Sequence, residues 1–311
     1  MRPAQSCPLC PGKGQFAYRA GDSFYKVTDY EADMYRCDRC GSLFQWPIPE
    51  RETIAGFYPS GYWQEGESQS VMARLQGLYI HKIMDWDLMS AVVRMKLSAG
   101  ANILDIGCSR GDWLARIRDY GYEVSGIEAD PRAAAYAEKV HQISVTQTDV
   151  DEWRPQQERF DGILFFHLLE HLRKPAEFLS RCHTGLKPGG KILMRVPNVA
   201  SLQAALTGKR WKGLEIPRHI MLFTPKALRE LIEKAGFDIE YLGTWSLRDG
   251  PPALTSSLFP AGEPTWQQIH DKPSAFGTLV YLGLNWLLTP LEIMAALGGK
   301  GAMITVIARK N

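Results

Sequence analysis

The segment Asn102-Ile-Leu-Asp-Ile-Gly-Cys-Ser-Arg-Gly111 decides the fold of this chain. The apolar run from Ile103 to Ile106 predicts a short buried strand. It runs directly into a turn bracketed by Gly107 and Gly111, and helix-forming sequence begins at Asp112. A strand, a glycine turn and a helix in this order let a nucleotide-like ligand lie against bare backbone amides. The sequence therefore predicts a nucleotide-type binding site at this turn.

The next apolar run supplies an acidic residue in the place such a site needs. Glu123-Val-Ser-Gly-Ile-Glu128 ends in a carboxylate about 20 residues after the turn, where it can bind both hydroxyls of a ribose. The turn is not the dinucleotide pattern G-x-G-x-x-G, because Ser109 occupies the middle position and the outer glycines are one position too close.

The turn resembles instead the first motif of class I S-adenosylmethionine-dependent methyltransferases, D-x-G-x-G-x-G. Asp105, Gly107 and Gly111 match that motif, and Ser109 replaces its central glycine. The resemblance implies S-adenosyl-L-methionine as cofactor, and an acidic residue after the third strand that binds the adenine amino group. The expected cofactor-binding residues are Asp105, Gly107, Cys108 through its backbone, Gly111, Glu128 and Asp149.

Later motifs follow in the order of the same family. Pro131 opens a predicted helix to Val140, since proline is favoured in a first helical turn, and strands are expected at Ile143–Val145 and Phe160–Phe166. Two further sequences resemble this family. One is "LEHL" after the second of these strands, with a helix to about Gly185, and the other is "LKPGGKILMRVPN" with its tight KPGG turn. The fold class they imply is α/β: a Rossmann-like, seven-stranded class I methyltransferase sheet with helices on both faces, ending in a strand near Ala302–Ala308 and preceded by a small zinc-ribbon domain.

Four cysteines near the amino terminus form two complete C-x2-C knuckles, Cys7, Cys10, Cys37 and Cys40. Two thiolates two residues apart on a tight turn can face one ion, and two such turns complete a closed tetrahedral site. The alternative is a pair of disulfides, but the rest of the chain is typical of a cytosolic protein, where thiols stay reduced. We expect a structural Zn²⁺ ion, because a closed site leaves no position for a reacting water.

The expected organisation is a zinc ribbon over 1–48, a linker and helical cover over 49–99, and a methyltransferase domain over 100–311 with substrate-pocket segments inserted at about 198–223 and 246–300. The length of 311 residues allows one large and one small domain. No charged segment precedes an apolar one at the amino terminus, so we expect a cytoplasmic protein. Tyr58, Tyr62 and Trp63 are expected to close over cofactor or substrate, or to pack between the two domains.

Residues 275–297 are unusually apolar and approach the length of a membrane span. Asn285, Pro290 and Glu292 interrupt the run, and the chain after it must return as the last strand, so a helical lid is expected. The lid could form a wall of the substrate pocket, the face of a homodimer or a contact with a membrane surface.

Two histidines are candidates for the catalytic base. His167 follows the predicted strand Phe160–Phe166, where members of the family place acceptor-facing residues, and a near-neutral imidazole suits deprotonation of a hydroxyl. His219 lies in the expected acceptor segment; a helix-capping role for His167 and a packed loop position for His219 are the structural alternatives. His167-x-x-Glu170-His171 also spells the pattern of inverted zinc peptidases, which is easily met by chance. Ubiquinone-type O-methyltransferases have E-x-x-E-H in this region, linked to a divalent ion; His167 replaces its first acid, which leaves metal assistance open.

The sequence thus predicts an S-adenosylmethionine-dependent methyltransferase acting on a hydroxyl of a sugar, lipid or secondary metabolite, with a partly apolar acceptor. The alternative is an RNA methyltransferase of the ribosomal RNA type that uses the ribbon for recognition, and a third option is a non-catalytic scaffold. RNA binding needs a basic, aromatic-interleaved surface. The net charge of +2 argues neither for nor against an acidic partner, but the basic residues are scattered, which argues against a nucleic-acid partner. The best available basic residues are Arg36, Arg39, Lys209, Arg210 and Lys212.

Overall fold

The computed structural model describes residues 2–50, 53–54, 56–57 and 85–311. The chain divides into two compact units. We call the first, Met1–Leu88 with Pro197–Ala227 and Gly243–Ile304, the ribbon unit, and the second, Met89–Val196 with Leu228–Leu242 and Thr305–Asn311, the sheet unit. Tyr58, Tyr62 and Trp63 lie outside the described residues, so their expected role stays a prediction.

The sheet unit is built on seven strands, as the sequence predicts. Their order is β11 (Phe237–Gly243), β12 (Met303–Lys310), β9 (Leu186–Pro197), β8 (Phe160–Phe166), β5 (Asn102–Ile106), β6 (Glu123–Glu128) and β7 (Val145–Gln147). β5 is parallel to β6 on one side and to β8 on the other, with Ile106 opposite Ile127. The carboxyl ends of these three strands therefore meet at one edge, which is where ligands bind in open α/β sheets.

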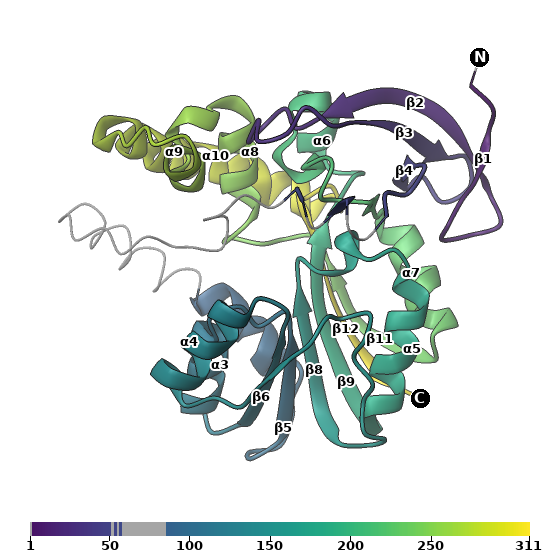
Figure 1. Cartoon of the computed structure of the whole chain (residues 1–311), viewed down its shortest axis with the longest axis vertical. Helices are drawn as coiled ribbons and strands as arrows, with labels where there is room; N and C mark the ends of the chain where they lie inside the picture. The colour runs from purple at the N-terminus through teal and green to yellow at the C-terminus, as the bar shows by residue number, and fades with distance from the viewer. Residues whose placement is uncertain (1, 51–52, 55, 58–84) are drawn as a thin grey trace. The chain divides into compact units, whose positions relative to one another are not determined.

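Helices cover both faces of this sheet, which confirms the predicted fold class (Figure 1). α3 (Asp112–Asp119) and α4 (Pro131–His141) pack on one face through Leu114 and Ala137, while α5 (Pro175–Gly185) packs on the other, with Phe178 at 5.0 Å from the ring of Phe165. α4 begins where the sequence predicts because Asp130 accepts hydrogen bonds from two backbone amides of its first turn.

Two local expectations need refinement. The strand expected at 143–145 is β7, two residues later. The KPGG sequence is assigned to β9, yet Leu186 pairs with Phe160 and Lys191 with Gly162, so residues 187–190 leave the ladder and rejoin it. Gly189 has φ of 73°, which glycine adopts without the cost of a Cβ. The predicted tight turn is thus an excursion within one strand.

The ribbon unit contains an antiparallel sheet ordered β1 (Gln5–Ser6), β2 (Lys13–Gly21), β3 (Glu31–Cys37), β4 (Leu43–Trp46) and β10 (Met221–Leu222). β10 pairs with β4, so the amino-terminal ribbon and the segment 197–227 share a sheet. They also share a core of Met34, Leu43, Trp211, Leu214 and Ile216. The expected domain bounds stay a prediction; the structure adds that these two parts of the chain form one compact unit.

Helices complete the ribbon unit: α6 (Leu202–Thr207), α8 (Gly250–Leu258), α9 (Pro264–Ile269) and α10 (Ala275–Leu297). α10 is long and apolar enough to cross a membrane by length and composition alone. Its one acid, Glu292, is buried and accepts hydrogen bonds from Gln203 Nε2 and the backbone amide of Ala302. Its outward residues include Phe276, Leu287 and Met294, each more than two thirds exposed. The predicted membrane-surface or homodimer contact through 275–297 stays a prediction.

Candidate functional site

The glycine turn after β5 has the backbone that its sequence requires. Gly107 (φ 80°), Ser109 (φ 49°) and Gly111 (φ 74°) all lie in the left-handed region. Ser109 is the strained one, since a side chain there costs free energy that glycine avoids. Gly111 is constrained twice, because a Cβ on it would also lie 2.8 Å from the Cβ of Ala137 in α4. A Cβ on Gly107 would meet nothing closer than 3.8 Å, so only its conformation demands glycine.

Glu128 connects the ends of β5 and β6. One carboxylate oxygen accepts a hydrogen bond from the backbone amide of Ser109 at 2.8 Å, and the other accepts from Ala129 and Asp130 at 2.8 and 2.9 Å. Because each carboxylate oxygen has two lone pairs, these three bonds leave one of the four acceptor positions, on the oxygen bonded to Ser109, for a hydroxyl donor of a ligand. The bond from Ser109 also stabilises the strained turn. The contact of Glu128 with a ribose stays a prediction, and the residues at this strand edge fit an adenosyl cofactor.

Asp105 lies one residue before the end of β5 and is almost fully buried. Burial, and then the nearby charge of Glu128, raise the pKa of its carboxyl from 3.8 to about 7. Close to neutral pH this carboxyl therefore changes charge readily, and a cationic group placed beside it would favour the ionised form.

Cys108 is a buried packing residue of the turn. Burial raises the pKa of its thiol, and its sulfur lies against Gly126 of β6, where an added Cβ would come within 2.4 Å. This agrees with a contribution of Cys108 through its backbone alone.

Asp149 follows β7 by two residues and has a local structural role. One of its carboxylate oxygens accepts from the backbone amide of Asp151 at 2.8 Å, and its carbonyl accepts from Glu152 and Trp153. A contact with an adenine amino group stays a prediction for this residue.

His167 occupies the position directly after β8, in the same sheet unit as the turn. Its φ of 50° is left-handed, which is uncommon for a residue with a side chain and marks a position worth testing for function. Its backbone amide donates to the carbonyl of Arg195 at 2.9 Å, and its Nδ1 lies 3.6 Å from a carboxylate oxygen of the fully buried Glu170.

The "LEHL" sequence does not continue His167 into a regular helix, contrary to expectation. Leu169–His171 form one 3-10 turn, and α5 begins only at Pro175. Leu168 has φ of −121°, and a residue before proline is driven away from helical conformation, as Lys174 is with ψ of 67°. His167 and His171, four residues apart, therefore do not lie on one helix face.

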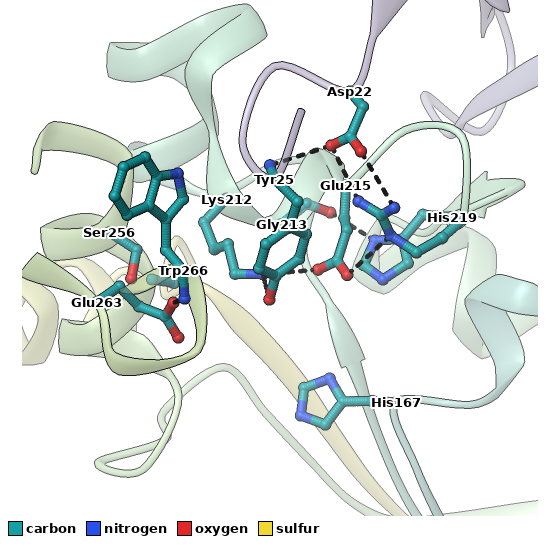
Figure 2. Close-up of polar contacts among 12 residues, drawn as sticks. Asp22, Tyr25, His167, Lys212, Gly213, Glu215, His219, Ser256, Glu263 and Trp266 are labelled. Carbon is teal, nitrogen blue, oxygen red and sulfur yellow. Dashed lines mark hydrogen bonds and ion pairs between the residues drawn. The ribbon is translucent and has the colours of Figure 1, made fainter. Parts of the chain in front are cut away.

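His219 lies in the ribbon unit, on the segment expected to contact the acceptor, and is 5% exposed. Its Nδ1 is 2.9 Å from the carbonyl of Gly213, which can only accept, so Nδ1 carries a proton and the ring can gain or lose a proton only at Nε2. Figure 2 shows this ring and the carboxylate of Glu215 in one close-up. A role of His219 as a catalytic base stays a prediction.

A buried charged network surrounds His219. The guanidinium of Arg218, fully buried, donates to both oxygens of Asp22 at 3.0 and 3.2 Å and to Glu215 at 3.3 Å (Figure 2). Lys212 Nζ donates to Glu215 at 2.8 Å and to the hydroxyl of Tyr25 at 2.7 Å.

Within this network Glu215 is held ionised in a strained backbone. Its φ is 34°. Burial acts to raise the pKa of its carboxyl, but the charges of Lys212, His219 and Arg218 together hold that pKa well below the usual range. The sequence did not predict this network, because Asp22 is 196 residues from Arg218. Lys212, considered above as a possible RNA contact, is ion-paired with Glu215 inside the ribbon unit.

The four cysteines converge on one point, as predicted. Their sulfur atoms lie within 4.8 Å of one another, with 3.9 Å between Cys7 and Cys40 and 3.5 Å between Cys10 and Cys37, and all four are free thiols. A zinc ion at about 2.3 Å from four tetrahedral sulfurs would hold them ~3.8 Å apart. The backbone amides of Leu9, Gly12 and Cys40 approach three of the sulfurs at 3.4–3.5 Å, which favours thiolates. The cysteines are placed to bind a metal ion.

Comparisons with known proteins agree with this geometry. Residues 80–242 match a family model described as a methyltransferase domain. The chain is 32% identical over 151 residues to a ubiquinone biosynthesis O-methyltransferase of Cereibacter sphaeroides, covering 45% of this chain and 61% of that protein. It is 28% identical over 159 residues to a "probable S-adenosylmethionine-dependent methyltransferase" of Mycolicibacterium smegmatis, covering 50% of this chain and 60% of that protein. The matches thus span about three fifths of the length of these relatives.

Among solved structures, the 4+2-cyclase SpnF has a similar fold, with a TM-score of 0.51 and 20% identity over 73% of this chain and 81% of that one. Since that protein is a cyclase by name, the shared fold alone does not specify a reaction.

Proposed function

Because this chain belongs to the class I S-adenosylmethionine-dependent methyltransferase family, we propose that it methylates a hydroxyl group of a small molecule: a sugar, a lipid or a secondary metabolite. The relatives named for ubiquinone biosynthesis are O-methyltransferases, which supports a hydroxyl acceptor. The single observation that supports the proposal is the hydrogen bond from Nδ1 of His219 to the Gly213 carbonyl, since a ring held with Nδ1 protonated exchanges a proton only at Nε2, as a general base requires.

In this proposal the sheet unit holds the cofactor. The carboxylate of Glu128 accepts a ribose hydroxyl, the turn from Gly107 to Gly111 provides close backbone approach, and Asp105 favours a positive charge beside it. S-adenosylmethionine, when bound, supplies an activated methyl group, so the protein mainly positions the acceptor and removes its proton.

His219 is the proposed base. Its Nε2 takes the acceptor proton, the Gly213 carbonyl keeps Nδ1 protonated, and the ionised Glu215 nearby stabilises the positive charge that the ring acquires. His167 is the second candidate for the base. It directly follows β8 with a left-handed backbone, and the nearby Glu170 can stabilise a positive charge on its ring. We propose zinc as the ion of the four-cysteine site, in a structural role.

The test is transfer of radiolabelled methyl groups by the zinc-loaded full chain to 3,4-dihydroxybenzoate, glucose and ribosomal RNA as probes of three acceptor classes. The proposal predicts label in a small-molecule hydroxyl, and a fall of about 100-fold or more in His219→Ala, the usual contribution of a general base. The matched control is His183→Ala, which replaces a histidine in α5 of the other unit. Label in RNA alone would contradict the proposal, and an unchanged rate in His219→Ala would contradict the assignment of the base.

A further inference from the structure

The amino-terminal ribbon is joined to the segment 211–224 by more than side-by-side packing. β10 adds to the edge of β4, with Met221 opposite Phe44 and Leu222 opposite Leu43. The edge of a strand offers unpaired backbone groups to any other strand or chain. Here the edge of β4 pairs with β10 inside the ribbon unit, and this pairing holds the segment that carries His219.

Gln45 extends this pairing to the residues that precede β10. Its backbone amide donates to the carbonyl of Ile220 at 3.0 Å. Its side-chain Nε2, fully buried, donates to the carbonyls of Pro217 and His219 at 2.7 and 2.8 Å. Both partners can only accept, so the orientation of the amide is fixed by chemistry. The side chain of Gln45 thus binds the backbone on both sides of Arg218, at Pro217 and at His219.

The metal knuckle lies at the other end of the same connection. Thr224 Oγ donates to the carbonyl of Cys40 at 2.7 Å and also accepts from the backbone amide of Ala227, at the start of α7 (Pro225–Lys234). Lys226 Nζ donates to the carbonyl of Arg39 at 3.0 Å. The segment between β10 and α7 is therefore bonded to the second knuckle, and the segment before β10 is bonded to Gln45, five residues beyond Cys40.

We propose that the four-cysteine ribbon serves as the support of the His219 segment, and that Gln45 is the positioning residue that sets the imidazole of His219. Gln45 holds the backbone of His219, while the Gly213 carbonyl holds its ring, so loss of the first lets the ring move from the second. The importance of this for methyl transfer rests on the proposed function, in which His219 is the base. The amino-terminal ribbon then has the role of orienting His219 within the ribbon unit.

The experiment measures the tautomer of His219 by long-range hydrogen–nitrogen NMR of the zinc-loaded full chain, with His219→Asn identifying its signals among the seven histidines. The wild type should show one tautomer, protonated on Nδ1. Gln45→Met keeps the side-chain volume but removes both donors, and should lose that single tautomer while one zinc per chain is retained. Gln15→Met is the control: the same change at an exposed position of β2, expected to leave the His219 signals unchanged.

Wild-type His219 signals in Gln45→Met would overturn the proposal, as would an equal disturbance in Gln15→Met. Should methionine not be tolerated, Gln45→Asn, one methylene too short to reach both carbonyls, makes the same comparison. The readout requires no acceptor. A changed tautomer in Gln45→Met together with full activity of His219→Ala would leave Gln45 a positioning residue and refute His219 as the base.

Discussion

The buried carboxyl of Asp105 makes the stability of the sheet unit depend on pH in a calculable way. Its pKa is about 7 in the folded chain and close to 3.8 when unfolded, because burial and Glu128 disfavour its charge. The folded state therefore keeps a proton that the unfolded state has lost. The resulting stability is fully present below about pH 4, falls as the pH rises to about 7 and is constant above that. The whole effect is ~4 kcal/mol, of which about 2–3 kcal/mol falls between pH 5 and pH 8.

Asp105→Asn tests this directly, since asparagine has nearly the same shape and stays neutral at every pH. The free energy of unfolding should be measured in urea at pH 5, 6, 7 and 8 for both proteins. We expect the variant to gain about 2–3 kcal/mol relative to wild type between pH 5 and pH 8. Other titrating groups cancel in this difference. A difference that stays constant across the four pH values would refute the reasoning.

The cause of the shift can be separated from its consequence. Part of it comes from the charge of Glu128, so Glu128→Gln should lower the pKa of Asp105, as followed by carbon-13 NMR of aspartate carboxyl groups. A pKa that stayed the same or rose in Glu128→Gln would show that the two carboxyls do not interact.

Three further predictions concern stability and metal binding. Gly111→Ala places a Cβ on a left-handed backbone and against the Cβ of Ala137, whereas Gly121→Ala only strains the backbone. The free energy of unfolding should therefore fall by about 1–3 kcal/mol more in Gly111→Ala than in Gly121→Ala. Equal losses in the two variants would argue against close packing of α4. Arg218→Met leaves Asp22 buried without its cation and should cost about 3–5 kcal/mol in urea unfolding, and adding Asp22→Asn should recover much of this loss; an additive double variant would contradict the pairing. Elemental analysis should find one zinc per chain, and a chelator should lower the melting temperature; a metal-free chain of equal stability would exclude a structural ion.

Local chemistry explains why the sheet unit could be read from the sequence. Gly107 and Gly111 stand where the backbone is left-handed, and Glu128 ends the neighbouring strand. Each feature is specified within about 20 residues, where turn chemistry and apolar runs are informative. The position of the cysteines in two knuckles is local in the same sense.

The surroundings of His219 could not be predicted because their contacts are distant in sequence. Gln45 is 174 residues from His219, and neither residue type signals the other. The left-handed conformation of His167 was also hidden, since histidine gives no warning of it; Pro175 was the available sign that no continuous helix follows.

Binding of S-adenosylhomocysteine to the zinc-loaded full chain, measured by calorimetry, tests the central claim most directly. The account predicts one site per chain that Glu128→Ala abolishes, while Glu123→Ala, at the exposed start of the same strand, leaves the affinity unchanged. Folded, zinc-loaded protein that binds no S-adenosylhomocysteine would contradict the enzymatic function altogether.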